Sequence, residues 1–216
     1  MNDEILLIDK PAGMTSFGVV ARVRRRLTVA AGHKVKVGHT GTLDPFATGL
    51  LILLTGKGTK RAEEFVKLDK VYEATVRLGA VSTTGDPEGE ITEMAKKAEF
   101  DEAKLKKVVE GYVGEIEQVP PAFSAIKIGG VRAYKLARKG KEVEMPARKV
   151  RIYGIEILDY AWPWLKIRTE VSSGTYIRTL AADIGAALGS GAYVTELRRL
   201  KVGEYEVGDA EKLPSE

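Results

Sequence analysis

The stretch that most constrains the fold is Gly38-His39-Thr40-Gly41-Thr42-Leu43-Asp44-Pro45-Phe46-Ala47-Thr48-Gly49, and the apolar residues 50–54 follow it directly. A short apolar run after a cluster of turn residues predicts a buried strand entered from a tightly turned loop. The glycines allow close backbone approach, and Pro45 stiffens the loop beside the carboxylate of Asp44. Asp44 is therefore a candidate for chemistry at a fixed orientation. An Asp before a Pro is also an ordinary turn former, so the residues alone leave both interpretations open.

Upstream of this loop, the sequence predicts a strand and a helix. The apolar residues 5–8 form a strand that Lys10-Pro11-Ala12-Gly13 ends, and Thr15 or Ser16 then caps a helix. Its spacing predicts an inner face made of Phe17, Val20, Val23 or Arg24, and Leu27.

Downstream, strands and helices are intermixed. We expect Thr59 to cap a short helix that ends near residue 66, and Asp101 to cap a helix that Gly114 ends. Residues 71–78 alternate so that Tyr72 lies on the inward face of a strand. The other expected elements are paired strands at 150–160 and 164–171, a helix at 176–188 closed by Gly189, and a last strand region at 194–207. Helices do not alternate regularly with strands, which predicts an α+β fold with a mixed sheet.

The composition excludes several chemistries. The 216 residues include no Cys, which excludes disulfides, thiolate nucleophiles and Cys-ligated zinc. The two histidines, His33 and His39, do not have the spacing of a zinc pair, although carboxylates could still hold magnesium. No glycine pattern matches a nucleotide-binding loop either. From these absences together, we expect no metal site and no cofactor.

Composition also predicts where the protein works. The N-terminus is acidic and no apolar run approaches the length of a bilayer span, so we expect a cytoplasmic protein with no membrane association. Asn and Gln occur once each, at Asn2 and Gln118. This depletion is typical of heat-adapted proteins, and a consensus-like or designed sequence would look similar.

The net charge of +4 is unevenly distributed, with basic residues concentrated in two places. Residues 127–151 carry many Lys and Arg, interleaved with Gly129, Gly130 and Tyr134 and preceded by Phe123. A second group lies near the N-terminus and comprises Arg22, Arg24, Arg25, Arg26, Lys34 and Lys36. Such clusters favour a polyanionic partner such as RNA or DNA, and a solvated helix face is the alternative for the N-terminal group.

Further motifs lie before and after residues 38–45. They are Lys10-Pro11-Ala12-Gly13-Met14-Thr15-Ser16, Lys70-Val71-Tyr72, Pro120-Pro121-Ala122-Phe123-Ser124-Ala125-Ile126-Lys127, Gly174-Thr175-Tyr176-Ile177-Arg178-Thr179-Leu180, and Leu197-Arg198-Arg199-Leu200 with Val202-Gly203. Together with residues 38–45, and in the same order, these motifs resemble those of the TruB family of tRNA pseudouridine synthases, and the resemblance covers residues 5 to about 207. It implies the pseudouridine synthase fold, with a largely antiparallel mixed sheet flanked by helices. It also implies isomerisation of uridine 55 in the T loop of tRNA.

The resemblance implies three catalytic residues. Asp44 matches the nucleophile, and Arg178 matches an arginine that pairs with it and favours the ionised carboxylate. Tyr72 matches a tyrosine that stacks on the flipped base and accepts the C5 proton, directly or through water. Direct attack on C1′ and glycal formation both remain open. From the residues alone, Arg178 could instead contact phosphate or be a helix-surface charge, and Tyr72 could be a core residue.

Further residues match substrate-binding positions. The resemblance implies that His39 fills or props the site of the extruded nucleotide, and that Tyr176 and Leu197 line the uracil pocket. Lys10 is grouped with them as a support of the active-site loop, together with Pro11. A loop histidine and two core residues are the plainer alternatives for His39, Tyr176 and Leu197.

The resemblance also implies how the chain is organised. Residues of about 120–148 correspond to a basic insertion that closes on the T loop and is mobile without RNA, with Lys127 and Arg132 at its phosphate contacts. We expect one catalytic domain over residues 1–216 without the C-terminal RNA-binding domain of longer relatives. The partner is the T stem-loop of tRNA, bound by a monomer that needs no protein partner. A non-catalytic tRNA-binding or folding module is the alternative.

Overall fold

The computed structural model describes residues 4–94, 100–124, 126–140 and 143–213. The chain divides into two compact units, Met1–Glu73 with Leu197–Glu216, and Ala74–Glu196. Strands β4 (Lys70–Leu78) and β12 (Ala192–Val202) each contribute residues to both units. The single catalytic domain expected over residues 1–216 stays a prediction.

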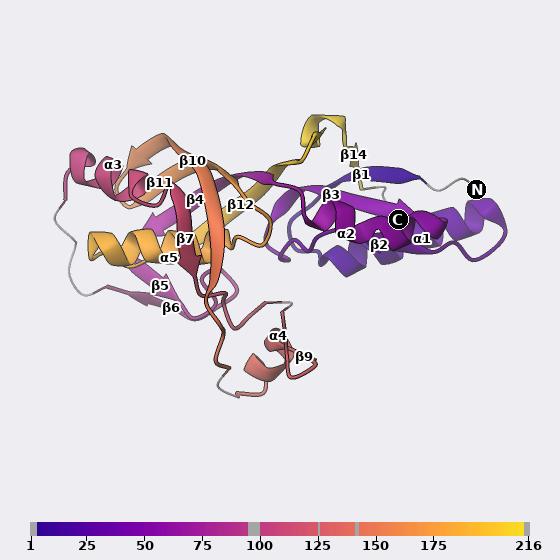
Figure 1. Ribbon diagram of the computed structural model, residues 1–216, viewed down its shortest axis with the longest axis horizontal. Coiled ribbons are helices and arrows are strands. Elements are labelled where there is room, and N and C mark those ends of the chain that lie inside the picture. The colour runs from indigo at the N-terminus through magenta and orange to yellow at the C-terminus, as the bar shows by residue number, and fades with distance from the viewer. Residues whose placement is uncertain (1–3, 95–99, 125, 141–142, 214–216) are drawn as a thin grey trace. The chain divides into compact units, whose positions relative to one another are not determined.

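The first unit is built around strand β3 (Thr48–Thr55) (Figure 1). Its strands follow the order β14-β1-β3-β12, with β2 paired to β3 and β13 paired to β12. The β1–β3 pair is antiparallel, whereas β3 with β12 and β1 with β14 are parallel. The other elements are β1 (Ile5–Lys10), α1 (Ser16–Ala31), β2 (Val37–His39), η1 (Gly56–Arg61), α2 (Ala62–Val66), β13 (Tyr205–Glu206), η2 (Val207–Asp209) and β14 (Glu211–Lys212).

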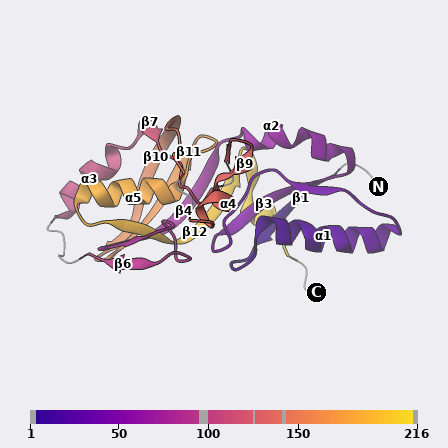
Figure 2. The ribbon, with the colours of Figure 1, turned by 90° about the horizontal axis from the view of Figure 1, so that it is seen from below.

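Strand β3 is covered on both faces, which explains its continuous apolar sequence. Leu51 and Leu53 pack with Val19, Val20 and Val23 of α1. On the other face of β3, Leu50, Ile52 and Leu54 form a second cluster with Phe65 of α2. Figure 2 shows α1 and α2 on opposite sides of β3. The strand predicted at residues 50–54 is confirmed, and its burial on both faces accounts for the absence of polar alternation.

Helix α1 begins as predicted, and its predicted inner face is confirmed at Val20, Val23 and Leu27 but not at Phe17. The Thr15 side chain accepts a hydrogen bond from the Gly18 N–H at 3.0 Å, as an N-cap does. Phe17, predicted to be buried, is 65% exposed. Ser16 instead turns inward to bond Leu43, so the buried face begins one residue earlier and continues through Val19, Val20 and Val23.

Two predicted helix ends also differ from the structure. Thr59 does not cap a helix, because it lies within the 3-10 turn η1, where its hydroxyl donates to the Gly56 carbonyl at 2.9 Å. Helix α3 (Glu102–Glu110) is capped by Asp101 as predicted, but it ends at Gly111. Gly114, the predicted end, starts the next strand.

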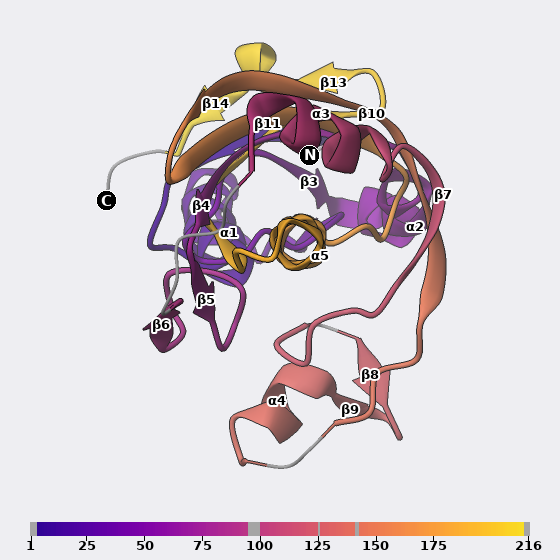
Figure 3. The same ribbon diagram turned by 90° about the vertical axis from the view of Figure 1, so that its left-hand side faces the viewer.

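The second unit holds strands in the order β12-β4-β11-β10-β7, and Figure 3 shows β4, β11, β10 and β7 curving around α5 (Ile177–Leu188). The predicted 150–160 and 164–171 pair is confirmed as antiparallel β10 and β11. The other elements are β5 (Ala80–Ser82), β6 (Ile91–Glu93), β7 (Gly114–Gln118), β8 (Lys127–Ile128), β9 (Val131–Arg132), α4 (Ala133–Ala137), β10 (Arg148–Ala161) and β11 (Trp164–Val171).

The α5 helix carries the core of this unit on the face that the sequence predicts. Its buried side chains include Ile177, Leu180, Ala181, Ile184 and Leu188, and Gly189 closes it in the left-handed conformation. The alternation predicted for residues 71–78 is confirmed as well, since the even-numbered side chains of β4 are buried. Most described strand pairs are antiparallel, so the α+β class with a mixed, largely antiparallel sheet is confirmed. In the described residues no helix is long and apolar enough to cross a membrane.

Candidate active site

The loop that carries Asp44 connects β2 to β3 and is anchored from the N-terminal motif. The Ser16 hydroxyl donates to the Leu43 carbonyl at 3.0 Å and accepts from the Leu43 N–H at 2.8 Å. The Gly13 N–H donates to the Pro45 carbonyl at 2.8 Å. Both neighbours of Asp44 are therefore fixed by backbone or buried side-chain bonds, while Asp44 itself stays half-buried.

Lys10 anchors the same loop with its ammonium group. The side chain is fully buried, and Nζ donates to the carbonyl oxygens of Pro11, Met14 and Pro45 at 2.8, 2.6 and 3.1 Å. Charge-assisted bonds to carbonyl dipoles offset the cost of burying an ammonium group. Lys10 therefore ties the backbone after Asp44 to the N-terminal motif.

Arg199 holds the other end of the loop, and the sequence alone gave it no role. This buried arginine of β12 donates from Nε to the Leu50 carbonyl at 2.7 Å and from Nη2 to the Gly41 carbonyl at 3.3 Å. The signal in the sequence is that Arg199 occupies a position of the strand where the alternation predicts a buried, apolar side chain. The Asp44 loop is thus fastened at Gly41, Leu43 and Pro45.

Three more predicted residues lie in the first unit. His39 ends β2, is paired with Leu53 in the ladder and is half-buried. Tyr72 lies on the inward face of β4 and is 9% exposed. Leu197 is buried in β12, and its carbonyl accepts a hydrogen bond from the Thr48 hydroxyl at 3.5 Å.

Lys70, two residues before Tyr72, is a second buried lysine. Its Nζ donates to the Val66 carbonyl at 2.6 Å and to the Leu68 carbonyl. Burial first, and then repulsion from the Arg199 guanidinium, lower the pKa of Lys70 to about 8. Lys70 therefore loses its charge around pH 8, well below the range of an exposed lysine.

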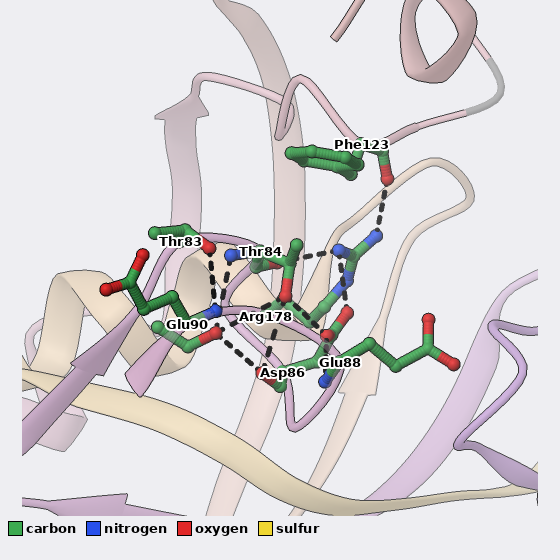
Figure 4. Close-up of polar contacts among 8 residues, drawn as sticks. Thr83, Thr84, Asp86, Glu88, Glu90, Phe123 and Arg178 are labelled. Carbon is green, nitrogen blue, oxygen red and sulfur yellow. Dashed lines mark hydrogen bonds and ion pairs between the residues drawn. The ribbon is translucent and has the colours of Figure 1, made fainter. Parts of the chain in front are cut away.

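Arg178 lies in the second unit, where it is buried and hydrogen-bonded (Figure 4). Nη1 donates to the Asp86 carboxylate at 3.0 Å and to the Thr84 carbonyl at 2.8 Å, and Nη2 donates to the Phe123 carbonyl at 2.8 Å. This burial excludes the alternative of an exposed helix-surface charge. The predicted pairing of Arg178 with Asp44 joins residues of different units and stays a prediction.

Asp86, which sequence reasoning missed, belongs to a turn built to hold it. The Thr84 hydroxyl and the Glu88 N–H donate to Oδ1 of Asp86 at 2.5 and 3.0 Å, while Oδ2 faces Arg178. Gly85 adopts a left-handed φ of 74°, which lets the turn pass close to the Arg178 side chain. The cluster Thr83-Thr84-Gly85-Asp86 after a strand is a turn signal that could have identified it.

Tyr176 caps α5, and both its backbone and its ring are held. The Gln118 side chain accepts from the Tyr176 N–H at 2.7 Å and donates to the Tyr176 carbonyl at 3.1 Å. The Arg148 guanidinium lies over the Tyr176 ring, 4.9 Å from its centroid, and also donates to the Gly174 carbonyl. Tyr176 and Arg178 therefore start the same helix from a fixed position.

The basic insertion forms a small hairpin followed by α4. Lys127 and Arg132 are both exposed and lie directly opposite each other across the β8–β9 pair. Like charges directly opposite each other on two strands repel. Residues 125 and 141–142 of the insertion lie outside the described residues.

The described residues contain no group of three or more His, Asp or Glu side chains arranged to hold a metal ion. The candidate site thus has two parts: the anchored Asp44 loop in the first unit, and the buried Arg178–Asp86 pair near Tyr176 in the second unit.

Solved structures identify the class of protein. The chain is 30% identical to a chain of a Cbf5–Nop10–Gar1 complex with a TM-score of 0.73, covering 97% of this chain and 52% of that one. A structure of a pseudouridylate synthase has the same fold, with a TM-score of 0.50 and 19% identity over 99% of this chain and 69% of that chain. The fold is that of the pseudouridine synthases.

Sequence comparison identifies the family. Residues 24–177 match the model of the TruB family pseudouridylate synthase (N terminal domain), and residues 178–214 match the tRNA pseudouridylate synthase B C-terminal domain. The tRNA pseudouridine synthase B of Bacteroides fragilis is 49% identical, covering 94% of this chain and 88% of that protein. The protein of the same name from Phocaeicola vulgatus is 47% identical, covering 95% and 88%. The chain belongs to the TruB family of pseudouridylate synthases.

Proposed function

We propose that this chain is a tRNA pseudouridine synthase that isomerises uridine 55 of the T loop, with Asp44 as its nucleophile. The observation that carries the proposal is the Asp44 loop, whose neighbours Leu43 and Pro45 are fastened by Ser16 and Lys10. A carboxylate on a fastened loop attacks or deprotonates a sugar without first having to be ordered. Membership of the family supplies the reaction that such a carboxylate serves.

The reaction leaves the atoms of the nucleotide unchanged in number. The bond from C1′ to N1 breaks, the uracil turns, a bond from C1′ to C5 forms, and C5 loses a proton while N1 gains one. Asp44 supports the first step, and Tyr72 stacks on the base and accepts the C5 proton, directly or through water. Arg178 pairs with Asp44 and favours its ionised form. Because substrate and product are isomers, the net reaction requires no oxidant, and we expect no cofactor.

The remaining predicted residues bind the RNA. His39 occupies the place of the flipped nucleotide, Tyr176 and Leu197 line the uracil pocket, and Lys127 and Arg132 neutralise phosphates. The opposed, exposed positions of these two cations in the β8–β9 hairpin support this role. We expect a monomer that acts on the T stem-loop of tRNA in the cytoplasm and needs no protein partner.

The decisive experiment compares Asp44→Asn with wild type on unmodified tRNA, mapping pseudouridine at each uridine. We expect loss of product at position 55 to below about 1% of wild type, with the Kd for tRNA changed by less than about threefold. Asp159→Asn, an exposed residue of β10, is the matched control and should leave the rate unchanged. Retained activity of Asp44→Asn contradicts the role of Asp44. A wild-type chain that binds tRNA without forming pseudouridine supports the non-catalytic module instead.

Arg178→Lys tests the second catalytic residue. An ammonium group cannot occupy the positions of both Nη1 and Nη2, which bond Asp86 and Phe123. We expect the single-turnover rate to fall by about a hundredfold or more. A rate near that of wild type would leave Arg178 with a structural role.

A further inference from the structure

The single glutamine of the chain has an unusual environment. Gln118 ends β7, is 1% exposed, and uses both ends of its amide on one residue, Tyr176, which lies 58 positions away. A buried amide needs partners for both its oxygen and its NH2 group, and here one residue supplies both. The Gln118 amide thus makes the same pair of hydrogen bonds with the backbone of Tyr176 as a residue of a neighbouring β-strand would make.

This pair of hydrogen bonds lies at the N-terminus of α5, because Tyr176 is its N-cap residue. Tyr176 has an extended backbone, with no side chain of its own capping the helix, and its carbonyl also accepts the first helical bond from the Leu180 N–H at 3.1 Å. The Gln118 amide therefore fixes the N–H and carbonyl directions of the residue from which the helix starts. A rotation there would move both the Tyr176 ring and the Arg178 side chain.

Neighbouring contacts depend on the same placement. Arg178, the second residue of α5, donates to the carbonyl of Phe123. Phe123 lies five residues after Gln118, on the segment that follows β7. Arg148, the register partner of Gln118 in the β7–β10 pair, lies over the Tyr176 ring. The strand pair thus holds Tyr176 from two sides, by the backbone through Gln118 and by the ring through Arg148.

We propose that Gln118 is a positioning residue for catalysis, which sets the start of α5 so that Tyr176 and Arg178 meet the uracil and the reacting carboxylate in productive geometry. This inference rests on the proposed function. Gln118 does not touch the substrate in this role. Its effect is on the rate of the chemical step, because displacing a group by about 1 Å can lower a rate by about a hundredfold.

Two variants test the proposal. Gln118→Met keeps the length of the side chain and removes both hydrogen bonds. Gln118→Leu replaces the amide by a branched apolar side chain and also removes both hydrogen bonds to Tyr176, the one from its N–H and the one to its carbonyl. The control is Thr169→Val in β11, which removes the bond from an equally buried hydroxyl to the Gly154 carbonyl at 2.8 Å.

The readout is the single-turnover rate of pseudouridine formation at saturating enzyme, measured beside the Kd for tRNA and the thermal melt. If Gln118 served only stability, its substitution would lower the fraction of folded enzyme. More enzyme would then be needed to saturate the tRNA, but the rate at saturation would stay the same. We expect both Gln118 variants to lose about thirtyfold to a hundredfold in that rate with Kd within about threefold, and Thr169→Val to keep the wild-type rate.

Each outcome decides the question. Saturating rates within about threefold of wild type in folded Gln118→Met or folded Gln118→Leu would overturn the proposal. Failure of both variants to fold would also overturn it, because Gln118 would then serve overall stability. Absence of pseudouridine with the wild-type chain contradicts the proposed function, and is thereby distinguished from a failure of this inference.

Discussion

At the scale of single residues, Ser16 shows how a small side chain controls the candidate nucleophile. Its hydroxyl is buried and bonds both the N–H and the carbonyl of Leu43, the residue before Asp44. We expect Ser16→Ala to lower the free energy of unfolding by about 1–3 kcal/mol, because the buried Leu43 groups lose their partner. The saturating rate should fall as well, since the loop gains freedom. Ser190→Ala, also fully buried, is the control for stability and should keep that rate.

Lys70 gives a prediction about pH. Its pKa is about 8 in the folded chain and near 10.5 in the unfolded chain, so between these values the unfolded state binds more protons. Stability contributed by Lys70 therefore rises with pH across this window, by at most about 1.4 kcal/mol per pH unit. Denaturant unfolding of wild type and Lys70→Met should show a difference that is constant below pH 7 and shifts in favour of wild type above pH 8. A difference independent of pH up to pH 10 would contradict the lowered pKa.

At the scale of elements, local sequence patterns predicted most helices and strands but not the contacts between them. Strand β3 and helix α5 were predictable because their apolar spacing reports directly which faces are buried. The exposure of Phe17 in α1 was not, because the buried position is taken by Ser16, which bonds Leu43, 27 residues further along. Asp44 could be found from its own loop, whereas Gln118 acts on a residue 58 positions away and leaves no local signal.

The parallel pairing of β3 with β12 depends on a glycine. Gly49 has a φ of 101°, and a Cβ there would overlap the Arg199 carbonyl and lie 2.7 Å from the Arg199 nitrogen. Gly32, which closes α1, also has a positive φ, but a Cβ there meets nothing within 4 Å. We expect Gly49→Ala to abolish folding or lower Tm by more than about 10 °C, and Gly32→Ala to cost about 1 kcal/mol. Equal effects of the two substitutions, measured by thermal melts, would show that the strands can separate to admit a methyl group.

At the scale of the whole molecule, composition and surface charge together predict heat stability. Asn and Gln occur once each and Cys is absent, and of the two amides Gln118 is buried. Exposed ion pairs in the described residues include Arg61–Glu64 at 2.8 Å and Lys149–Glu115 at 2.9 Å. Such pairs contribute little at 25 °C, but the cost of desolvating them falls as temperature rises.

We therefore expect Tm to lie above the mesophile range of about 45–65 °C. Thermal melts followed by circular dichroism at 0.1 M and 1 M salt test both parts of this argument. The higher salt shortens the screening length from about 10 Å to about 3 Å, so ion pairs that matter at high temperature should be weakened and Tm should fall by a few degrees. A Tm near 50 °C would contradict heat stability. A high Tm that does not change with salt would instead assign it to the packed faces of β3 and α5, where burial of apolar side chains is insensitive to screening.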